Sequence, residues 1–140
     1  MHLSRKAAAG AVASAAAALM STGMGTAHAA YDYYGSFAVA DRGDQWSIGY
    51  AYNAPDQGRA DADAMDECGY SNCVVALRWN NGCAALVDRD GRLYTGLGNN
   101  LAAAERNALA ASGPDPNPLM VSLGSADPSQ ASVLISKCTA

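Results

Sequence analysis

The sequence predicts an α+β fold in which a strand–strand–helix–strand unit occurs twice, with the strands in one antiparallel-rich sheet and both helices packed on it. Three observations lead to this prediction. Short segments of alternating polarity come in pairs around Gly/Asp turns, an alanine-rich helical segment follows each pair, and another alternating segment follows each helix. Because the same order of signals appears twice, we interpret the domain as an internal duplication.

The first unit begins with two predicted strands, residues 36–40 and 45–52, on either side of an Asp/Gly-rich turn. In the second strand, four large side chains alternate onto one face, which predicts that they belong to the core. They are Trp46, Ile48, Tyr50 and Tyr52.

A helix then follows, with Asp56 as its expected N-cap and Gly69 just beyond its C-terminal end. Its buried stripe is expected at positions four residues apart, namely Ala60, Ala64 and Cys68. Residues 73–79 are predicted to form the closing strand of this unit.

The second unit repeats this order, with strands at residues 83–87 and 92–97, a helix at 101–112 and a closing strand at 133–138. Either Asn99 or Asn100 is expected to cap the helix. The side chains predicted to face inward are Leu101, Ala104, Ala108 and Leu109.

Two features set the second unit apart from the first. In the second unit, Gly96 and Gly98 are expected at the positions that correspond to Tyr50 and Tyr52. This loss of two large side chains predicts either a groove or a simple packing asymmetry. Residues 114–131 are an additional segment that contains four prolines, and within it residues 119–123 are expected to form a short strand. A loop of this length is usually functional or mobile.

The N-terminal segment is typical of a secretory signal. A basic start, an apolar run of about 14 residues and a small-x-small exit predict a signal peptide over residues 1–29, cleaved after Ala29. The apolar run is shorter than the roughly 20 residues that a membrane-spanning helix needs. We therefore expect a secreted, extracellular domain over residues 30–140 that is not stably inserted in a membrane.

The charge of residues 30–140 limits the partners that we expect. Seven cationic side chains stand against thirteen acidic ones, and both histidines, His2 and His28, lie in the predicted signal. Nucleic-acid affinity comes largely from cations that neutralise phosphates, so we expect no nucleic-acid partner. The lack of histidine excludes Ser-His-Asp and Cys-His catalysis and His-ligated zinc.

The cysteines predict a disulfide framework, because an even number in a small exported domain is usually oxidised. We expect Cys68 to pair with Cys73, joining a helix end to the next strand, and Cys83 to pair with Cys138, joining the first strand of the second unit to its last. A four-cysteine zinc site is the alternative, which we disfavour because only one close cysteine pair is present.

Several motifs together resemble a known family. They are Tyr34-Gly35-Ser36-Phe37-Ala38-Val39, Tyr50-Ala51-Tyr52, Glu67-Cys68-Gly69, Cys73-Val74-Val75 and Asn81-Gly82-Cys83-Ala84-Ala85-Leu86. The chain is similar to the small exported family of mycobacteria and other actinobacteria catalogued as domain of unknown function 4189. The resemblance implies an α+β domain, export and two disulfides, and it implies no chemistry. The segment 114–131 departs from the family pattern.

The remaining groups with chemical potential are carboxylates and tyrosines. Asp63 and Glu67 lie four residues apart on one helix face, as in a cation site or an acid–base pair, but we favour a solvated helix face with Arg59 as partner. The turn at residues 88–91 begins like a calcium loop but lacks the later ligands. We assign no catalytic residue, metal or cofactor.

The sequence therefore favours a non-enzymatic binding or interaction module, acting on an extracellular or envelope protein. All seven tyrosines lie in residues 30–140, and tyrosine is enriched at recognition surfaces. Two alternatives stay open. One is an inhibitor or immunity-type protein that acts through residues 114–131, and the other is a small hydrolase that depends on Asp63 and Glu67.

Overall fold

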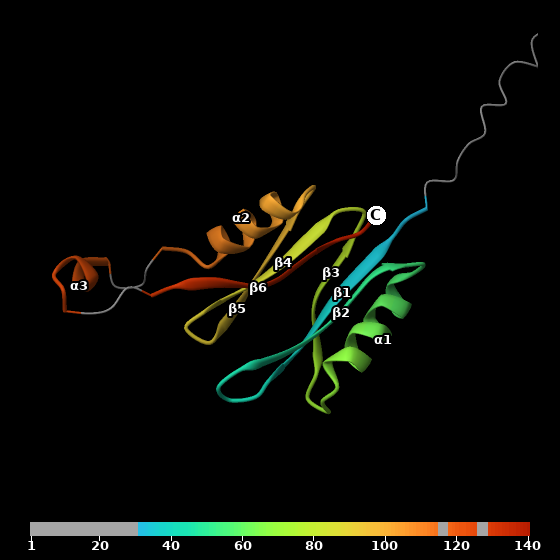
Figure 1. Ribbon diagram of the computed structural model, residues 1–140, viewed down its shortest axis with the longest axis horizontal. Helices are drawn as coiled ribbons and strands as arrows, with labels where there is room; N and C mark the ends of the chain where they lie inside the picture. Colours follow the sequence, from blue (N-terminus) through green and yellow to red (C-terminus); the bar gives the residue numbers. More distant parts are fainter. Residues whose placement is uncertain (1–30, 115–117, 126–128) are drawn as a thin grey trace, which may run out of the picture. The chain divides into compact units, whose positions relative to one another are not determined.

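In the computed structural model the described residues are 31–114, 118–125 and 129–140. The first half of this region contains β1 (Tyr34–Asp41), β2 (Trp46–Ala54), α1 (Gln57–Cys68) and β3 (Val74–Asn80). The second half contains β4 (Cys83–Arg89), β5 (Arg92–Gly98), α2 (Leu101–Ala111), α3 (Pro118–Ser122) and β6 (Ala131–Cys138). Figure 1 shows the two halves, each with its long helix on the outer side of its strands. The predicted α+β class and the duplicated strand–strand–helix–strand order are confirmed.

The prediction of one shared sheet is wrong, because each half forms its own antiparallel sheet of three strands. The strand orders are β2-β1-β3 and β5-β4-β6. In each half the first strand lies in the centre, with both of its edges already paired inside that half. The halves therefore meet through sheet faces rather than through sheet edges.

Three apolar layers hold these elements together. The middle layer joins the two sheets and contains Phe37 and Trp79 from one and Ala84 and Leu86 from the other. The outer layers join each sheet to its own helix. The central strands are thus buried on both faces, which explains why β1 and β4 are short apolar runs rather than strictly alternating ones.

Small residues let each helix lie very close to its sheet. A Cβ atom added to Gly49 of β2 would lie 2.0 Å from the carbonyl oxygen of Ala64, and one added to Gly96 of β5 would lie 2.2 Å from the amide nitrogen of Ala108. The space on the Cβ side of Gly96 and Gly98 is therefore filled by the backbone of α2. Gly98 nevertheless lines a pocket of about 430 Å³ together with residues of the β3–β4 connection, whereas Gly96 does not.

The strand registers correct the expected match between the two halves. Ala38 pairs with Gly49 in the first sheet, and Ala85 pairs with Gly96 in the second. Gly96 therefore corresponds to Gly49, one residue before Tyr50. Trp46, Ile48 and Tyr50 do pack against the middle layer, but Tyr52 is 48% exposed and not part of the core.

The helix boundaries follow the expected capping chemistry. The Asp56 carboxylate accepts from the Arg59 amide at 2.8 Å, Gly69 adopts a left-handed φ of 76°, and the Asn100 side chain accepts from the Ala103 amide at 2.8 Å. The expected stripe of Ala60, Ala64 and Cys68 is buried.

In α2 only part of the expected inner face is buried. Ala104 and Ala108 lie inside, whereas Leu101 and Leu109 are 44% and 36% exposed. The close approach at Gly96 explains this difference, because it leaves room on the inner face for alanines but not for leucines.

Residues 118–122 form α3 instead of the expected strand. Proline is well suited to the first turn of a helix, and Pro118 stands there. Residues 115–117 and 126–128 of the additional segment, and the predicted signal over residues 1–29, lie outside the described residues. Among the helices of the described ranges, none is both long and apolar enough to cross a bilayer.

Candidate functional site

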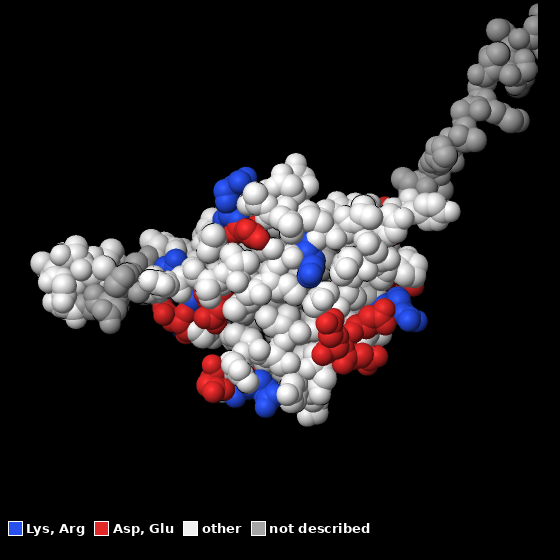
Figure 2. All heavy atoms as spheres, in the orientation of Figure 1, with Lys and Arg blue, Asp and Glu red and all other residues white. Residues whose placement is uncertain are grey.

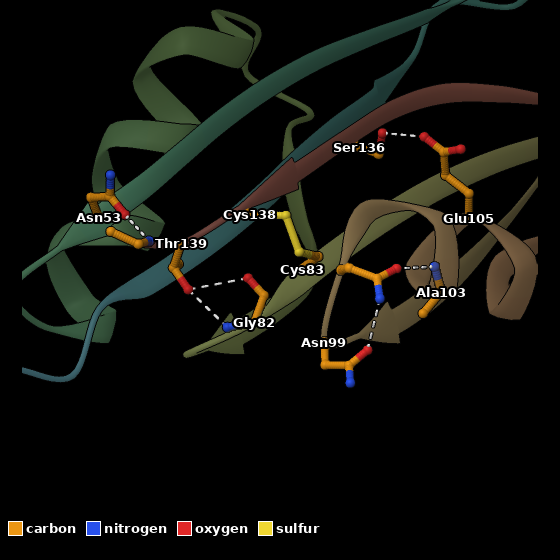
Figure 3. The surroundings of a disulfide bond; sticks show 11 residues. Asn53, Gly82, Cys83, Asn99, Ala103, Glu105, Ser136, Cys138 and Thr139 are labelled. Carbon is orange, nitrogen blue, oxygen red and sulfur yellow. Dashed lines mark hydrogen bonds between the residues drawn. A yellow bond between two sulfur atoms is a disulfide. The ribbon is translucent and has the colours of Figure 1, made fainter.

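The cysteines form the two expected pairs, Cys68 with Cys73 and Cys83 with Cys138. The first disulfide joins the end of α1 to the start of β3. The second joins the start of β4 to the end of β6, where the two cysteines face each other in the strand register (Figure 3). Each disulfide stays inside its own half. Because all four cysteines are paired, none offers a thiolate for nucleophilic chemistry.

A polar cluster around Asp61 fastens α1 to the first sheet. Its carboxylate accepts from the buried Ser36 hydroxyl, from Gln57 Nε2 at 3.0 Å and from Arg78 Nε at 2.8 Å. Burial raises the pKa of Asp61, but the hydrogen bonds from Ser36, Arg78 and Gln57 and the charge of Arg78 outweigh it. The pKa of Asp61 therefore lies below its ordinary value. A carboxylate held ionised in this way is a structural anchor and a poor proton donor.

The two carboxylates singled out in the sequence have separate partners. Asp63 pairs with Arg59 at 3.0 Å on the surface, and Glu67 accepts from the backbone amide of Tyr50 at 2.9 Å. Figure 2 shows carboxylates gathered over the exposed side of α1. The structure thus gives each of these groups a local role in a charged helix face, and nothing pairs them with each other.

The suspected calcium loop at residues 88–91 is the tight turn between β4 and β5. Asp90 and Gly91 take left-handed φ values of 56° and 76°, as a two-residue hairpin turn requires. Across the described ranges, no three His, Cys, Asp or Glu side chains are grouped so that they could hold a metal ion.

A pocket of about 450 Å³ opens between the β1–β2 hairpin and the β4–β5 hairpin, and we call it the hairpin pocket. Its apolar surface comes from Trp46 and Ile48 of β2 and Leu134 of β6. The charged residues that the described part of the chain contributes to this lining are all carboxylates, namely Asp41, Asp44 and Asp88.

One hydrogen bond fixes the wall of the hairpin pocket across the two sheets. The Trp46 indole Nε1 donates to Asp88 Oδ2 at 2.8 Å. The other oxygen of Asp88 accepts from the Gly91 amide at 3.4 Å, which ties the same carboxylate to its own turn. The Trp46 ring is therefore held in place before any ligand arrives, with one carboxylate at its edge.

The hairpin pocket repeats one feature of the duplicated unit. Asp41 ends the central strand of the first half and accepts from the Gly43 amide at 2.8 Å, just as Asp88 does near the end of β4 with Gly91. The sequence alone predicts only that both aspartates lie in turns. Asp41 and Asp88 occupy matching positions in the two copies, which could have indicated that they lie close together. This inference requires the knowledge that the two sheets pack face to face.

Comparison with known proteins identifies the family. Residues 34–116, more than half of the chain, match the family model described as "Domain of unknown function (DUF4189)". The chain belongs to this family. The DUF4189 match covers both sheets except for β6, so Cys138 and the additional segment before it lie largely beyond the matched residues.

Curated relatives of this DUF4189 chain come from mycobacteria. Protein Rv1269c of Mycobacterium tuberculosis (strain ATCC 25618 / H37Rv) and Protein Mb1300c of Mycobacterium bovis (strain ATCC BAA-935 / AF2122/97) are each 36% identical over 80 residues, or 57% of this chain. The chain spans 61% of the length of these relatives.

A solved structure supports the fold. The chain is similar to the protein of the "NMR structure of Rv1813c from Mycobacterium tuberculosis", with a TM-score of 0.50 and 21% identity. The likeness covers 76% of this chain and 75% of the other. At this level of identity it concerns the architecture and not the activity.

Proposed function

We propose that the protein is exported and acts by contact, as a non-enzymatic binding module whose hairpin pocket receives a cationic side chain of a partner polypeptide. The observation that carries this proposal is the composition of the pocket wall. Three carboxylates surround an apolar surface formed by Trp46, Ile48 and Leu134, and among the described residues of the lining no cation neutralises them.

The chemistry of this wall suits arginine or lysine. Both side chains have an apolar stem and a charged end, so the stem can cover Ile48 and Leu134 while the charge meets Asp41 and Asp44. A guanidinium also stacks favourably on an indole ring, which Trp46 supplies. Because Asp88 already holds that ring, less conformational freedom is lost on binding.

An NMR titration with a peptide pair tests this proposal. The probe is an acetylated and amidated peptide with a single arginine, and its matched control has citrulline, which has nearly the same shape and no charge. The chain has two tryptophans, so the indole N–H signal of Trp46 reports on the pocket and that of the buried Trp79 serves as internal reference.

We expect the arginine peptide to shift the Trp46 signal and the citrulline peptide to leave it unchanged. Asp41→Asn with Asp44→Asn should weaken arginine binding by at least fivefold, since both exposed carboxylates lose their charge. The control Asp63→Asn with Asp66→Asn removes the same charge from α1 and should change the affinity by less than twofold. Equal shifts with both peptides, or equal losses in both variants, would show that the pocket does not select a cation.

Export is tested separately. N-terminal sequencing of the protein from the culture fluid should give a chain that begins at Ala30, as cleavage after Ala29 requires. Recovery of the intact chain from the cytosol, with its cysteines reduced, would refute export without bearing on the hairpin pocket.

A further inference from the structure

We propose a second binding site, for the oxyanion of a phosphate or sulfate group, on the opposite side of the β4–β5 hairpin. This site shares no side chain with the hairpin pocket and does not depend on the function proposed for it. It lies in a pocket of about 450 Å³ whose lining includes Arg89, Arg92, Tyr94 and Ser112, and we call it the arginine pocket.

The strand register explains why these side chains converge. Arg89 pairs with Arg92, and Val87 pairs with Tyr94, so all four side chains point to the same face of the second sheet. Val87 is part of the apolar layer beneath α2, which identifies that face as the helix side. The two arginines therefore stand at the end of the hairpin, beside the C-terminal end of α2 where Ser112 lies.

Arg89 is half-buried, and two of its guanidinium nitrogens have no partner in the described part of the chain. Its Nε and Nη1 atoms are inaccessible to solvent and have no hydrogen-bond partner. Within the described ranges, the arginines that form ion pairs are Arg59 and Arg78, and neither Arg89 nor Arg92 does so. A buried N–H group without a partner is costly, and a bound water or ion commonly completes such a group in native structures.

The other charges and dipoles around the arginine pocket do not cancel the two guanidiniums. Among the described residues of the lining Asp90 is the one carboxylate, and its Oδ2 accepts from the Ser129 hydroxyl at 2.7 Å. Ser112 donates its hydroxyl to the carbonyl oxygen of Leu109 at 2.6 Å, and the end of α2 adds a partial negative charge. Counted over the described lining, two positive charges stand against one negative charge, which makes the arginine pocket locally cationic in an acidic domain.

This chemistry selects an oxyanion attached to a small organic group. Guanidinium groups bind phosphate and sulfate through paired charge-assisted hydrogen bonds, because their planar fork matches two oxygens of the anion. Tyr94 adds an aromatic ring to the wall, and the volume exceeds that of an inorganic ion alone. We therefore infer a monoester of phosphoric or sulfuric acid as the ligand class.

The experiment compares inorganic phosphate, inorganic sulfate and phenyl phosphate against chloride at constant ionic strength. Binding is followed by NMR titration of the arginine Nε–H signals, and stability by thermal unfolding. We expect phenyl phosphate to bind at least fivefold more tightly than inorganic phosphate, and an anion at ten times its Kd to raise Tm by about 5 °C. A preference for sulfate over phosphate would identify a sulfate ester as the natural ligand.

Arg89→Gln is the decisive variant and Arg59→Gln is its matched control. Arg89→Gln should weaken binding at least tenfold and leave Tm in chloride unchanged or higher, because the charge that it removes has no ion-pair partner among the described residues. Arg59→Gln removes a surface charge with the same chemistry and should change the affinity by less than twofold. If Arg89→Gln does not fold, Arg92→Gln provides the same comparison.

Two results would overturn the inference. Equal stabilisation of the wild type and both variants by phosphate would show a general salt effect with no site. A fall of Tm for Arg89→Gln in chloride, together with unchanged phosphate binding, would show that Arg89 serves only to neutralise the end of α2.

Discussion

The two halves of the domain have the same topology but fasten their strands differently. In the first half Ser36 of β1 pairs with Arg78 of β3, and both side chains bind the Asp61 carboxylate. In the second half the corresponding register positions of β4 and β6 are Cys83 and Cys138, which form a disulfide. A hydrogen-bonded ion cluster and a covalent bond therefore occupy the same place in the two copies.

This difference shows which features the fold requires in both copies. The glycine under each helix is retained at Gly49 and Gly96, and so are the buried alanines opposite them. The interaction that links the central strand to its neighbour differs between the halves, because an ion cluster serves in the first and a disulfide in the second. Both halves thus require a glycine where the helix contacts the sheet. The three predictions below compare the effect of changing these glycines with the effect of removing the disulfides or the Asp61 cluster.

The largest effect is expected from the disulfide of the second half. Cys83→Ala with Cys138→Ala opens a loop of 55 residues in sequence separation and should lower the free energy of unfolding by about 4 kcal/mol. Cys68→Ala with Cys73→Ala opens a separation of 5 residues and should cost about 2 kcal/mol. Denaturant unfolding measures both, and a larger loss for the shorter loop would contradict the comparison.

The glycines beneath the helices should come next and should behave alike in the two halves. Gly49→Ala and Gly96→Ala each place a Cβ atom within 2.2 Å of helix backbone, so each should cost about 3 kcal/mol. The control is Gly58→Ala within α1, whose nearest added contact is a side-chain oxygen at 3.3 Å, and it should change stability by less than about 1 kcal/mol. Tolerance of alanine in one half alone would mean that the halves do not share this requirement.

The smallest effect is expected from the ion cluster of the first half. Asp61→Asn should cost about 2 kcal/mol at pH 7, because charge-assisted hydrogen bonds from Ser36 and Arg78 are weakened. The pKa of Asp61 is depressed in the folded state, so its contribution is present above the unfolded pKa of about 3.9 and is lost as the pH falls through the folded value.

Wild type and Asp61→Asn should therefore converge in stability as the pH is lowered below about 4. Asp63→Asn is the matched control, since the Arg59–Asp63 pair has side chains 66% and 45% exposed and should contribute no more than about 0.5 kcal/mol. A constant difference between wild type and Asp61→Asn across this pH range would show that the loss comes from shape and not from charge.

Local signals in the sequence were sufficient for most of the fold. The helix and strand positions could be predicted because their signals are local, namely the caps at Asp56 and Gly69 and the alternating polarity of the strands. The cysteine pairing followed from the order of the strands. The division into two sheets depends on which edges are already occupied, which is a property of the whole unit. The predicted match of Gly96 with Tyr50 was wrong by one residue, because only the pairing register shows that Gly96 corresponds to Gly49.

The candidate sites could not be predicted, because each depends on which residues meet across elements. Asp41 and Asp88 lie far apart in the sequence, and their predicted turns explain both residues. Nothing in the sequence around Trp46 indicates that its indole donates to Asp88. Arg89 looked like an ordinary turn residue. Its burial follows from its position at the end of a central strand, with Arg92 on one side and Ala131 on the other.

The placement of the two disulfides has a consequence for how copies of the chain can associate. One lies wholly in the first half and the other wholly in the second, and only residues 81 and 82 connect β3 to β4. Two molecules can therefore trade halves and form an intertwined dimer in which every crosslink and every face-to-face contact is kept. In such an exchange the hinge would be residues 81 and 82, which form the whole connection between the halves.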